Sequence, residues 1–415
     1  MALSLYFPLL LQLIFLVRPS FSQNPILPKA AIFPLTKDFP AHHYVSKLFM
    51  GSNLDPVELV LDLNGPFTWA DCGSISASGS RQPVNACSLK CSMAAGPTKG
   101  CFTPGYKYNS SSCTLPAENA ASGASASGEV NEDEIAMEFW AGPGLSSSLA
   151  GNERFLFSCA PSSLLEGLAD GAKGVFGLGN SRISLPSQFS TSFGFLDRKF
   201  SLCIPASSNG AIFLGGGPHD GDFSSPMIYT PLVFKKNGLR DASYYIHLSS
   251  IKVSGKKLPL QEKGLIGTKL STVVAYTTLE RTIYAAFVDA YVKAAQEVNL
   301  TLVSSIAPFE VCFSSDGVGN RNSGPNVPVI DLVLQSEMVK WRILGKNSMV
   351  LVNDDIMCLG FLDGGINPKD LIVIGGYQME DHLLEFHLGN SKLGISPLAM
   401  DGKSCSDFGP SGFVG

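Results

Sequence analysis

The feature that most constrains the fold is a short apolar strand that runs into glycine and occurs once in each half of the chain. The first copy is Gly174-Val-Phe-Gly-Leu-Gly179 and the second is Leu371-Ile-Val-Ile-Gly-Gly376. Two similar segments predict two similar lobes, joined at a seam in the polar, glycine-rich stretch 215–225. We therefore expect an N-terminal lobe over residues 23–222 and a C-terminal lobe over residues 223–415.

Strand signals dominate the chain, because short apolar or alternating runs are separated by clusters of Gly, Pro, Asn and Ser. Segment 118–134, which contains no aromatic residue, has the composition of an exposed hairpin or mobile loop. Helical periodicity is clear in one place, 279–298, where apolar residues recur at three- and four-residue spacing. The pattern predicts an all-β protein with a few short helices. The clearest expected strands are Val57–Leu63, Phe155–Cys159, Ala211–Leu214, Tyr244–Val253, Val329–Leu334, Met349–Val352 and Leu371–Ile374.

The first residues differ in composition from the rest of the chain. Segment 3–17 is almost wholly apolar, Arg18 and Pro19 follow, and the small residues Ser20 and Ser22 precede Gln23. This pattern predicts a secretory signal peptide over residues 1–22. A membrane anchor is the competing interpretation, but the run is too short to span a bilayer comfortably, and no later stretch approaches the length of a spanning segment.

All ten cysteines lie after this segment. An even number of cysteines in an oxidising compartment predicts five disulfides. Zinc is the alternative for the four cysteines between residues 87 and 113, but their spacing is irregular and no histidine lies nearby. We expect no metal and no cofactor. The cysteines are Cys72, Cys87, Cys91, Cys101, Cys113, Cys159, Cys203, Cys312, Cys358 and Cys405.

The surface chemistry limits the partners. Two N-x-S/T triplets, at Asn109 and Asn299, predict N-glycosylation on exposed loops. The net charge is −5, and no run of Lys or Arg is longer than a pair. Neither nucleic acid nor an anionic membrane is therefore an expected partner. We expect a monomer.

One candidate catalytic residue stands out. Asp62 lies at the end of the strongly apolar run Leu59–Leu61, where a strand meets a turn. A carboxyl in such a place performs acid–base catalysis when a second carboxyl faces it, because the two then share one proton. Other catalytic patterns, such as Gly-x-Ser-x-Gly and His-Glu-x-x-His, do not occur. The His42-His43 pair is interpreted as a solvated pair rather than a metal site.

Six motifs cover nearly all of the chain after residue 22. They are Leu61-Asp-Leu-Asn-Gly-Pro-x-x-Trp69, Val175-Phe-Gly-Leu-Gly179, Ala211-Ile-Phe-Leu-Gly-Gly-Gly-Pro218, Tyr229-Thr-Pro-Leu232, Leu270-Ser-Thr-Val-Val-Ala-Tyr-Thr-Thr-Leu279 and Ile374-Gly-Gly-Tyr-Gln-Met-Glu-Asp381. Together they resemble the plant pepsin-like proteins. Within that superfamily the sequence is most similar to the branch of extracellular dermal glycoprotein, the basic 7S globulins and the inhibitors of microbial xylanases and xyloglucan endoglucanases. The resemblance implies the bilobal fold of aspartic peptidases.

Working peptidases of this fold carry Asp-Thr/Ser-Gly in each lobe. Here Asp62 is followed by Leu63 and Asn64, and Ser271 stands where the resemblance places the second aspartate. The flap tyrosine is also absent, because no tyrosine occurs between Tyr108 and Tyr229. A positioned acid or base accelerates a reaction by roughly 10²–10⁴, so these changes predict loss of peptidase activity and a structural role for Asp62.

The resemblance implies a secreted plant-defence protein whose loops block the cleft of a microbial glycoside hydrolase, either a xyloglucan endoglucanase or an endoxylanase. In the inhibitors, an Arg or His lies on the loop before the last cysteine. This chain has Met400 and Asp401 there, and Lys403 is the only cation nearby. Arg321 and the pair Lys340 and Arg342 are weaker candidates.

Three alternatives remain open. The globulin members of the branch suggest a storage or cell-wall glycoprotein. A receptor-like protein that binds a peptide hormone is a further possibility, and residual endopeptidase activity is another. The resemblance also implies a disulfide pairing: Cys312 with Cys358, Cys203 with Cys405, Cys72 with Cys159, and the remaining four cysteines among themselves.

Overall fold

The computed structural model describes residues 30–96, 101, 112–140, 148–192, 198–207, 209–217, 226–234, 241–260, 265–398 and 402–408. The expected signal peptide at residues 1–22 lies outside the described residues, and so does the expected lobe boundary between 222 and 223. Among the helices of these described segments, none is long and apolar enough to cross a membrane.

The protein consists mostly of β-strands, which confirms the all-β prediction. The first half contains β1 Ala30–Asp38, β2 His43–Met50, β3 Asp55–Asp62, β4 Trp69–Ala70, β5 Gln82–Pro83, α2 Leu89–Ala95, β6 Thr114–Asn119, β7 Ala124–Trp140, β8 Ser148–Cys159, η1 Ser162–Leu165, β9 Gly174–Gly177, α3 Leu185–Ser192, β10 Lys199–Cys203 and β11 Asn209–Gly215. The second half begins with β12 Ile228–Val233, β13 Tyr245–His247, β14 Ser250–Val253, β15 Lys256–Lys257, β16 Ile266–Leu270, β17 Thr277–Leu279 and α4 Arg281–Glu297. It continues with β18 Leu302–Val303, β19 Cys312–Ser314, β20 Asn320–Arg321, β21 Gly324–Pro325, β22 Ile330–Val333, β23 Lys340–Ile343, α5 Gly345–Ser348, β24 Met349–Asn353, β25 Ile356–Leu359, β26 Phe361–Asp363, β27 Ile372–Ile374, α6 Gly376–Met379, β28 His382–His387, β29 Lys392–Pro397 and η5 Cys405–Phe408.

Each strand expected from the sequence is present. The expected strand Phe155–Cys159 is the end of the longer β8, which begins at Ser148. The run Tyr244–Val253 is divided into β13 and β14. The two strands belong to different sheets, because β13 pairs with β16 whereas β14 pairs with β22. The break therefore marks the place where the chain passes from one sheet to another.

The expected long helix is α4, which packs against β14, β17 and β26 of the second half. It begins after Glu280, whose side chain accepts hydrogen bonds from the N–H groups of Thr282 and Ile283. Phe287 and Tyr291 are fully buried on one face of α4, and Phe287 lies against Phe361 with ring centroids 4.8 Å apart. The apolar stripe is thus a packing surface, as its spacing predicts.

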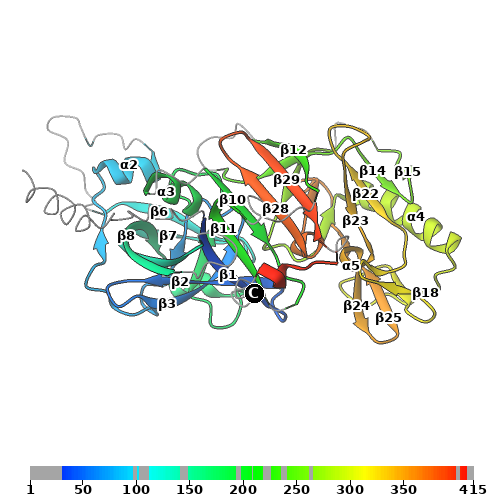
Figure 1. The fold of residues 1–415 in the computed structure, drawn as a ribbon, viewed down its shortest axis with the longest axis horizontal. Coiled ribbons are helices and arrows are strands. Elements are labelled where there is room, and N and C mark those ends of the chain that lie inside the picture. Colours follow the sequence, from blue (N-terminus) through cyan, green and yellow to red (C-terminus); the bar gives the residue numbers. More distant parts are fainter. Residues whose placement is uncertain are drawn as a thin grey trace, which may run out of the picture.

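Strands from both halves of the sequence form one central sheet, in the order β1, β11, β10, β28, β29, β12. The joint between the halves is the antiparallel pair β10–β28, in which Lys199–Cys203 faces His387–Leu383. Figure 1 shows this joint in the middle of the molecule, with elements of the first half on one side and α4, β14, β15, β18 and β22–β25 on the other. The two halves are therefore connected by main-chain hydrogen bonds.

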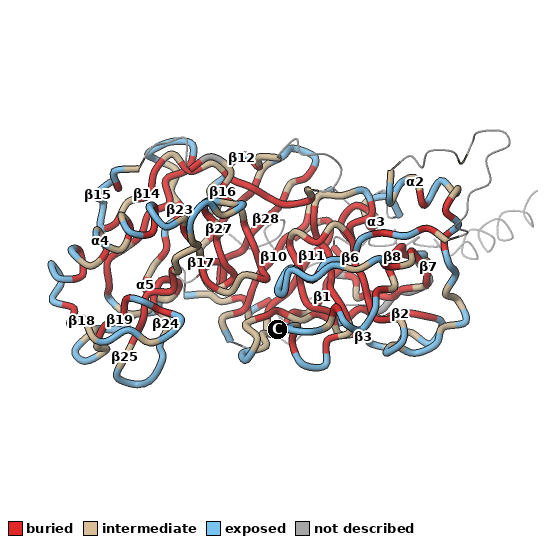
Figure 2. Tube along the Cα trace, turned by 180° about the vertical axis from the view of Figure 1, so that it is seen from behind, coloured by how far each residue is buried: buried red, intermediate tan, exposed pale blue. Residues whose placement is uncertain are grey.

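Buried residues fill the interior of both halves and the central sheet, whereas the exposed residues lie at turns and outer strands (Figure 2). Phe200, Tyr244 and Phe386 pack together in the core beneath the central sheet. The interpretation of His42 and His43 as a solvated pair is wrong for His43, which is 4% exposed. Its burial on β2 lowers the pKa of the His43 imidazole.

Candidate functional site

Asp62 and Ser271, the two positions that the resemblance equates with the aspartates of a peptidase, lie where two similar three-stranded arrangements meet. In the first, β9 lies parallel to β3 and antiparallel to β4, and Asp62 faces Gly177. In the second, β27 lies parallel to β16 and antiparallel to β17, and Leu270 faces Ile374. The two strand-to-glycine segments that opened the sequence analysis are thus the central strands of these two arrangements.

The register places Asp62 and Ser271 at equivalent positions. Leu61 pairs with Phe176 in the first arrangement, and Leu270 pairs with Ile374 in the second. Asp62 and Ser271 are the residues directly after Leu61 and Leu270, and both are buried. The equivalence expected from the motifs is therefore reproduced by the strand pairing.

One hydroxyl joins the two loops. Thr272 Oγ1 donates to the carbonyl oxygen of Leu61 at 2.9 Å and accepts from the N–H of Leu63 at 3.0 Å. The equivalent residue of the first loop is Leu63, which has no polar side-chain atom. The reciprocal connection comes from Asn64, whose Nδ2 donates to the carbonyl oxygen of Leu270 at 2.8 Å and whose Oδ1 accepts from the N–H of Tyr244 at 3.1 Å.

Burial dominates the electrostatics of Asp62 and raises the pKa of its carboxyl above the ordinary value. The N–H of Asn64, 2.8 Å from Oδ1, and the charge of Lys269 lower the pKa in part. Glu118 raises it further by repulsion. Ser271 Oγ, in the corresponding place of the second arrangement, accepts a hydrogen bond from the N–H of Val274 at 3.2 Å.

A hairpin formed by β6 and β7 lies close to this site. Trp69 Nε1 donates to the carbonyl oxygen of Glu118 at 3.0 Å, which ties the hairpin to β4. Asn119 is fully buried, and its Nδ2 donates to the carbonyl oxygens of Leu164 and Glu166. Segment 118–134 is therefore a hairpin, one of the two expected alternatives, and its turn residues 120–123 carry no aromatic side chain.

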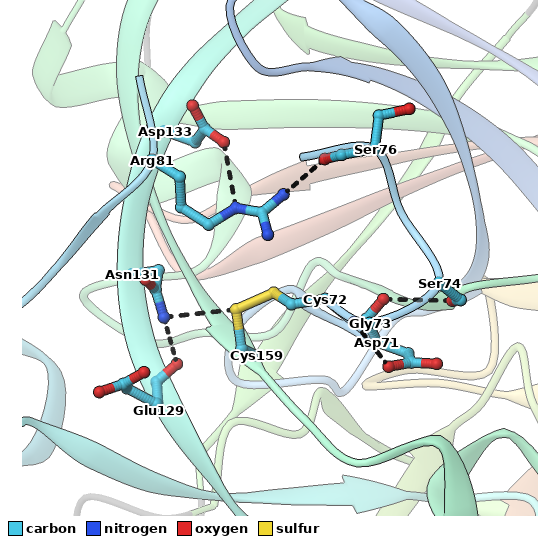
Figure 3. Close-up of a disulfide and its surroundings, with 10 residues drawn as sticks. All are labelled: Asp71, Cys72, Gly73, Ser74, Ser76, Arg81, Glu129, Asn131, Asp133 and Cys159. Carbon is cyan, nitrogen blue, oxygen red and sulfur yellow. Dashed lines mark hydrogen bonds and ion pairs between the residues drawn. A yellow bond between two sulfur atoms is a disulfide. The ribbon is translucent and has the colours of Figure 1, made fainter. Parts of the chain in front are cut away.

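The disulfide Cys72–Cys159 joins the segment after β4 to the end of β8, and Cys159 lies beside the base of the same hairpin, where it faces Glu129 of β7 (Figure 3). Asn131 Nδ2 on β7 donates to Cys159 Sγ at 3.3 Å. The fully buried Asp133 accepts from Arg81 Nε at 3.4 Å and from the hydroxyls of Ser78 and Ser80. These contacts fix the segment after β4 against β7, and so they fix the position of the base of the hairpin.

The five disulfides expected from the cysteine count are present. The pairings Cys72–Cys159, Cys203–Cys405 and Cys312–Cys358 are confirmed, and the remaining four cysteines pair as Cys87–Cys101 and Cys91–Cys113. Within the described part of the chain, no group of three or more His, Cys, Asp or Glu side chains is placed to hold a metal ion.

The candidate partner-binding residues do not all lie together. Met400 and Asp401 are outside the described residues, as is the glycosylation site Asn109. Asn299 is exposed at the end of α4. Lys403 and Arg321, in contrast, belong to neighbouring segments. Arg321 ends β20, directly before the turn residue Asn322, and a Cβ at Gly402, directly before Lys403, would lie 3.9 Å from Asn322 Nδ2.

Asp381 holds these two loops in place, which the sequence analysis did not anticipate. Its Oδ1 accepts from the N–H of Cys405 at 2.9 Å, and its Oδ2 lies 2.6 Å from Lys346 Nζ. The N–H of Lys346 donates in turn to the carbonyl oxygen of Ser323, in the turn between β20 and β21. We call Arg321, Asn322, Gly402 and Lys403 the two-loop surface.

Arg342 lies elsewhere and is paired. Its Nε is 3.1 Å from Asp331 Oδ1, and Lys340 Nζ is 3.6 Å from Asp331 Oδ2. The register of β22 and β23 sets these contacts, because Asp331 faces Arg342 directly. Arg321 is exposed and forms no ion pair with any residue that the structure describes, so it presents its charge to solvent.

The strand pairing, the two equivalent loops and the central sheet define a bilobal pepsin-like protein. Two family models match the chain, "Xylanase inhibitor N-terminal" over residues 44–216 and "Xylanase inhibitor C-terminal" over residues 243–397. The chain therefore belongs to the xylanase-inhibitor family of pepsin-like proteins, which confirms the resemblance noted in the motifs.

Relatives and solved structures span almost the whole chain. "Probable aspartic proteinase GIP2" of Nicotiana benthamiana is 41% identical over 93% of this chain and 93% of its own. "Basic 7S globulin 2" of Glycine max is 31% identical over 94% of this chain and 92% of its own. The crystal structure of edgp matches with a TM-score of 0.84 and 38% identity, covering 92% of this chain and 98% of that one. The crystal structure of the soybean basic 7S globulin matches with a TM-score of 0.79 and 30% identity, covering 92% of this chain and 98% of that one.

Proposed function

We propose that this protein is a secreted, proteolytically inactive pepsin-fold protein that binds and inhibits a microbial glycoside hydrolase, either a xyloglucan endoglucanase or an endoxylanase. The observation that carries the proposal is the two-loop surface, in which Arg321 and Lys403 lie on neighbouring loops fixed by Asp381. The match to xylanase-inhibitor family models supports the choice of partner.

The loss of peptidase chemistry supports the same proposal. Ser271 occupies the position equivalent to Asp62, and its hydroxyl accepts from a main-chain N–H. A serine there cannot exchange a proton with Asp62 as a second carboxyl does. A peptidase would have a hydroxyl side chain in place of Leu63 and a tyrosine in the hairpin turn. We therefore assign this protein a binding role instead of a catalytic one.

The chemistry of the partner fits the two-loop surface. Most glycoside hydrolases place two carboxyl groups in an open cleft, and cations that enter such a cleft gain electrostatic complementarity. A specific interface buries about 800 Å² on each partner, with a few central anchors. Arg321 supplies a planar guanidinium suited to a carboxylate, whereas Lys403 supplies a point charge.

The experiment is a titration of the purified glycosylated protein against both enzymes, with sugar release followed at mildly acidic pH. Stoichiometric inhibition is expected with one of them. Arg321→Ala and Lys403→Ala are each expected to weaken it about tenfold, in the range of a hot-spot residue. Arg342→Ala is expected to weaken the inhibition less, because Arg342 is already paired with Asp331. Lys293→Ala, on α4, serves as the matched control.

Two outcomes oppose the proposal. The absence of inhibition with both enzymes would favour the storage or cell-wall role that the names of the globulin relatives suggest. Cleavage of a denatured protein at acid pH by the wild type, abolished by Asp62→Ala, would instead show that the protein is a residual endopeptidase, as the name of another relative suggests.

A further inference from the structure

A crevice opens on the outer face of the N-terminal lobe, where β1, β2 and β7 diverge. β1 pairs with β2 at Leu35–Asp38 and with β7 at Ala30–Ile32, whereas β2 pairs with β7 at Phe49–Met50. Phe33, Pro34, Lys47, Leu48 and Met137 belong to none of these three pairings. The resulting crevice has a volume of about 430 Å³, which lies in the range of small-molecule sites.

The floor of this crevice is apolar although it belongs to an outer face. Pro34, Val45 and Phe49 line it and are half-buried, and Ala136 of β7 closes its base. The outward face of a half-exposed sheet normally carries polar side chains. A row of apolar residues from three strands instead gives the crevice a surface that favours contact with an apolar molecule.

The rim of the crevice carries more negative than positive charge. Lys37 Nζ lies 2.6 Å from Glu380 Oε1, and Lys47 Nζ lies 3.3 Å from Glu58 Oε1, so both lysines are paired. Asp38 and Asp170 also line the crevice. Neither of them forms an ion pair with a residue that the structure describes.

The segment around Asp170 forms a wall. Ala169 and Ala172 pack against Val60 on the outer face of β3, and Val45 contacts the same cluster. Asp170 itself is exposed. The second carboxylate, Asp38, is held by a hydrogen bond from the N–H of Ala41 to its Oδ1 at 2.8 Å. The two carboxylates are therefore placed by the fold at the edge of an apolar floor.

We propose that this crevice binds a small amphipathic amine, whose aromatic or branched aliphatic body contacts the floor and whose positive charge meets Asp38 and Asp170. The volume accommodates one compact apolar body. The carboxylates favour a cation over an anion of the same shape. The proposal does not depend on inhibition of a glycoside hydrolase, because the crevice and the two-loop surface share no residue.

The test uses two probes of the same shape and opposite charge, 2-naphthylmethylammonium and 2-naphthylacetate, titrated calorimetrically into the purified full-length protein. Saturable binding of the amine to one site is expected, at least tenfold tighter than that of the acid. Thr36→Trp, which places a large side chain at an exposed lining position, is expected to abolish it. Asp38→Asn combined with Asp170→Asn keeps the shape of both side chains and is expected to remove the preference for the amine.

Asp316→Asn, at an exposed carboxylate outside the crevice, is the control and should leave both affinities unchanged. Circular dichroism of each variant confirms that it is folded. The proposal is overturned by equal binding of the two probes to the wild type or by the absence of saturable binding. Amine binding that survives Thr36→Trp places the amine elsewhere and overturns it as well.

Discussion

Asn64 Nδ2 donates a hydrogen bond to the carbonyl oxygen of Leu270 at 2.8 Å and so connects the loop of Asp62 to the loop of Ser271. Its Oδ1 accepts from Tyr244, so one amide satisfies two main-chain groups of the other lobe. Leu63, in the place equivalent to Thr272, makes no such bond through its side chain. The two loops are thus connected in both directions: Thr272 bonds to the loop of Asp62, and Asn64 bonds to the loop of Ser271.

Replacing Asn64 tests this connection. Asn64→Ala leaves the Leu270 carbonyl oxygen and the Tyr244 N–H without their partner, so we expect a loss of about 1–3 kcal/mol in the free energy of unfolding. Urea unfolding followed by fluorescence measures it. Gln296→Ala, on the exposed face of α4, is the matched control and should cost less than about 0.5 kcal/mol. Equal effects of the two substitutions would contradict the proposed role of Asn64.

The pH dependence of stability tests the environment of Asp62. Burial raises the pKa of Asp62 in the folded protein, so the folded state binds this proton more tightly than the unfolded chain does. The stabilisation of the folded state by this bound proton is fully present below the ordinary Asp pKa of 3.8. It is lost as the pH rises through the pKa of Asp62 in the folded protein. Asp62→Asn, which keeps an acceptor for the Asn64 N–H, should therefore raise the melting temperature at pH 7.

The same comparison made at decreasing pH supplies the control. The difference in melting temperature between Asp62→Asn and the wild type should shrink as the pH approaches 3.8. A variant that is less stable than the wild type at pH 7 would show that ionised Asp62 stabilises the fold, contrary to the burial argument.

Restoring a second carboxyl is not expected to restore activity. In Ser271→Asp, Asp62 and the new carboxylate lie on loops joined by Thr272, so they repel each other when both are ionised. We expect no cleavage of denatured protein at acid pH, because Leu63 and the hairpin turn still lack the polar and aromatic groups of a peptidase. The melting temperature should fall at pH 7 and recover at acid pH, where the pair carries a proton. Measurable cleavage by this single variant would refute the prediction.

The buried ion pair between Lys37 and Glu380 joins β1 to the segment after α6. Tyr44 also donates to Glu380 Oε1, at 2.7 Å, and burial raises the pKa of the Glu380 carboxyl while Lys37 lowers it. Lys37→Met leaves a buried carboxyl without its cation and should cost about 3–5 kcal/mol in the free energy of unfolding.

A double substitution separates this effect from a general loss of packing. Lys37→Met combined with Glu380→Gln removes both charges, so urea unfolding should show that it recovers most of the loss. If the double variant is as unstable as the sum of the two single variants, the ion pair is not the cause.

Some of this architecture could be predicted from the sequence. The two strand-to-glycine segments predicted two similar lobes because each is local, and the spacing of Phe287 and Tyr291 predicted the buried face of α4. Three of the five cysteine pairings followed from the resemblance, whereas the pairings Cys87–Cys101 and Cys91–Cys113 came only from the structure. By contrast, Thr272 and Leu61 lie 211 residues apart, and no local pattern indicates that a threonine will bond to a distant carbonyl oxygen.

The candidate site was harder to predict for the same reason. Arg342 has the same side chain as Arg321, and only the register of β22 and β23 shows that Asp331 neutralises it. Asp381 follows an ordinary short helix in the sequence, and its role depends on Cys405 and Lys346, which belong to separate segments. Which cations are accessible is therefore a property of the folded chain.

The joint between β10 and β28 has a consequence for synthesis. A ribosome releases Lys199–Cys203 long before His382–His387, and at about 5–20 residues per second the delay is on the order of ten seconds or more. During that time β10 has an unpaired edge and Cys203 waits for Cys405, 202 residues later. The nascent first half therefore needs protection from other chains and from premature oxidation until β28 has been translated and the central sheet can close.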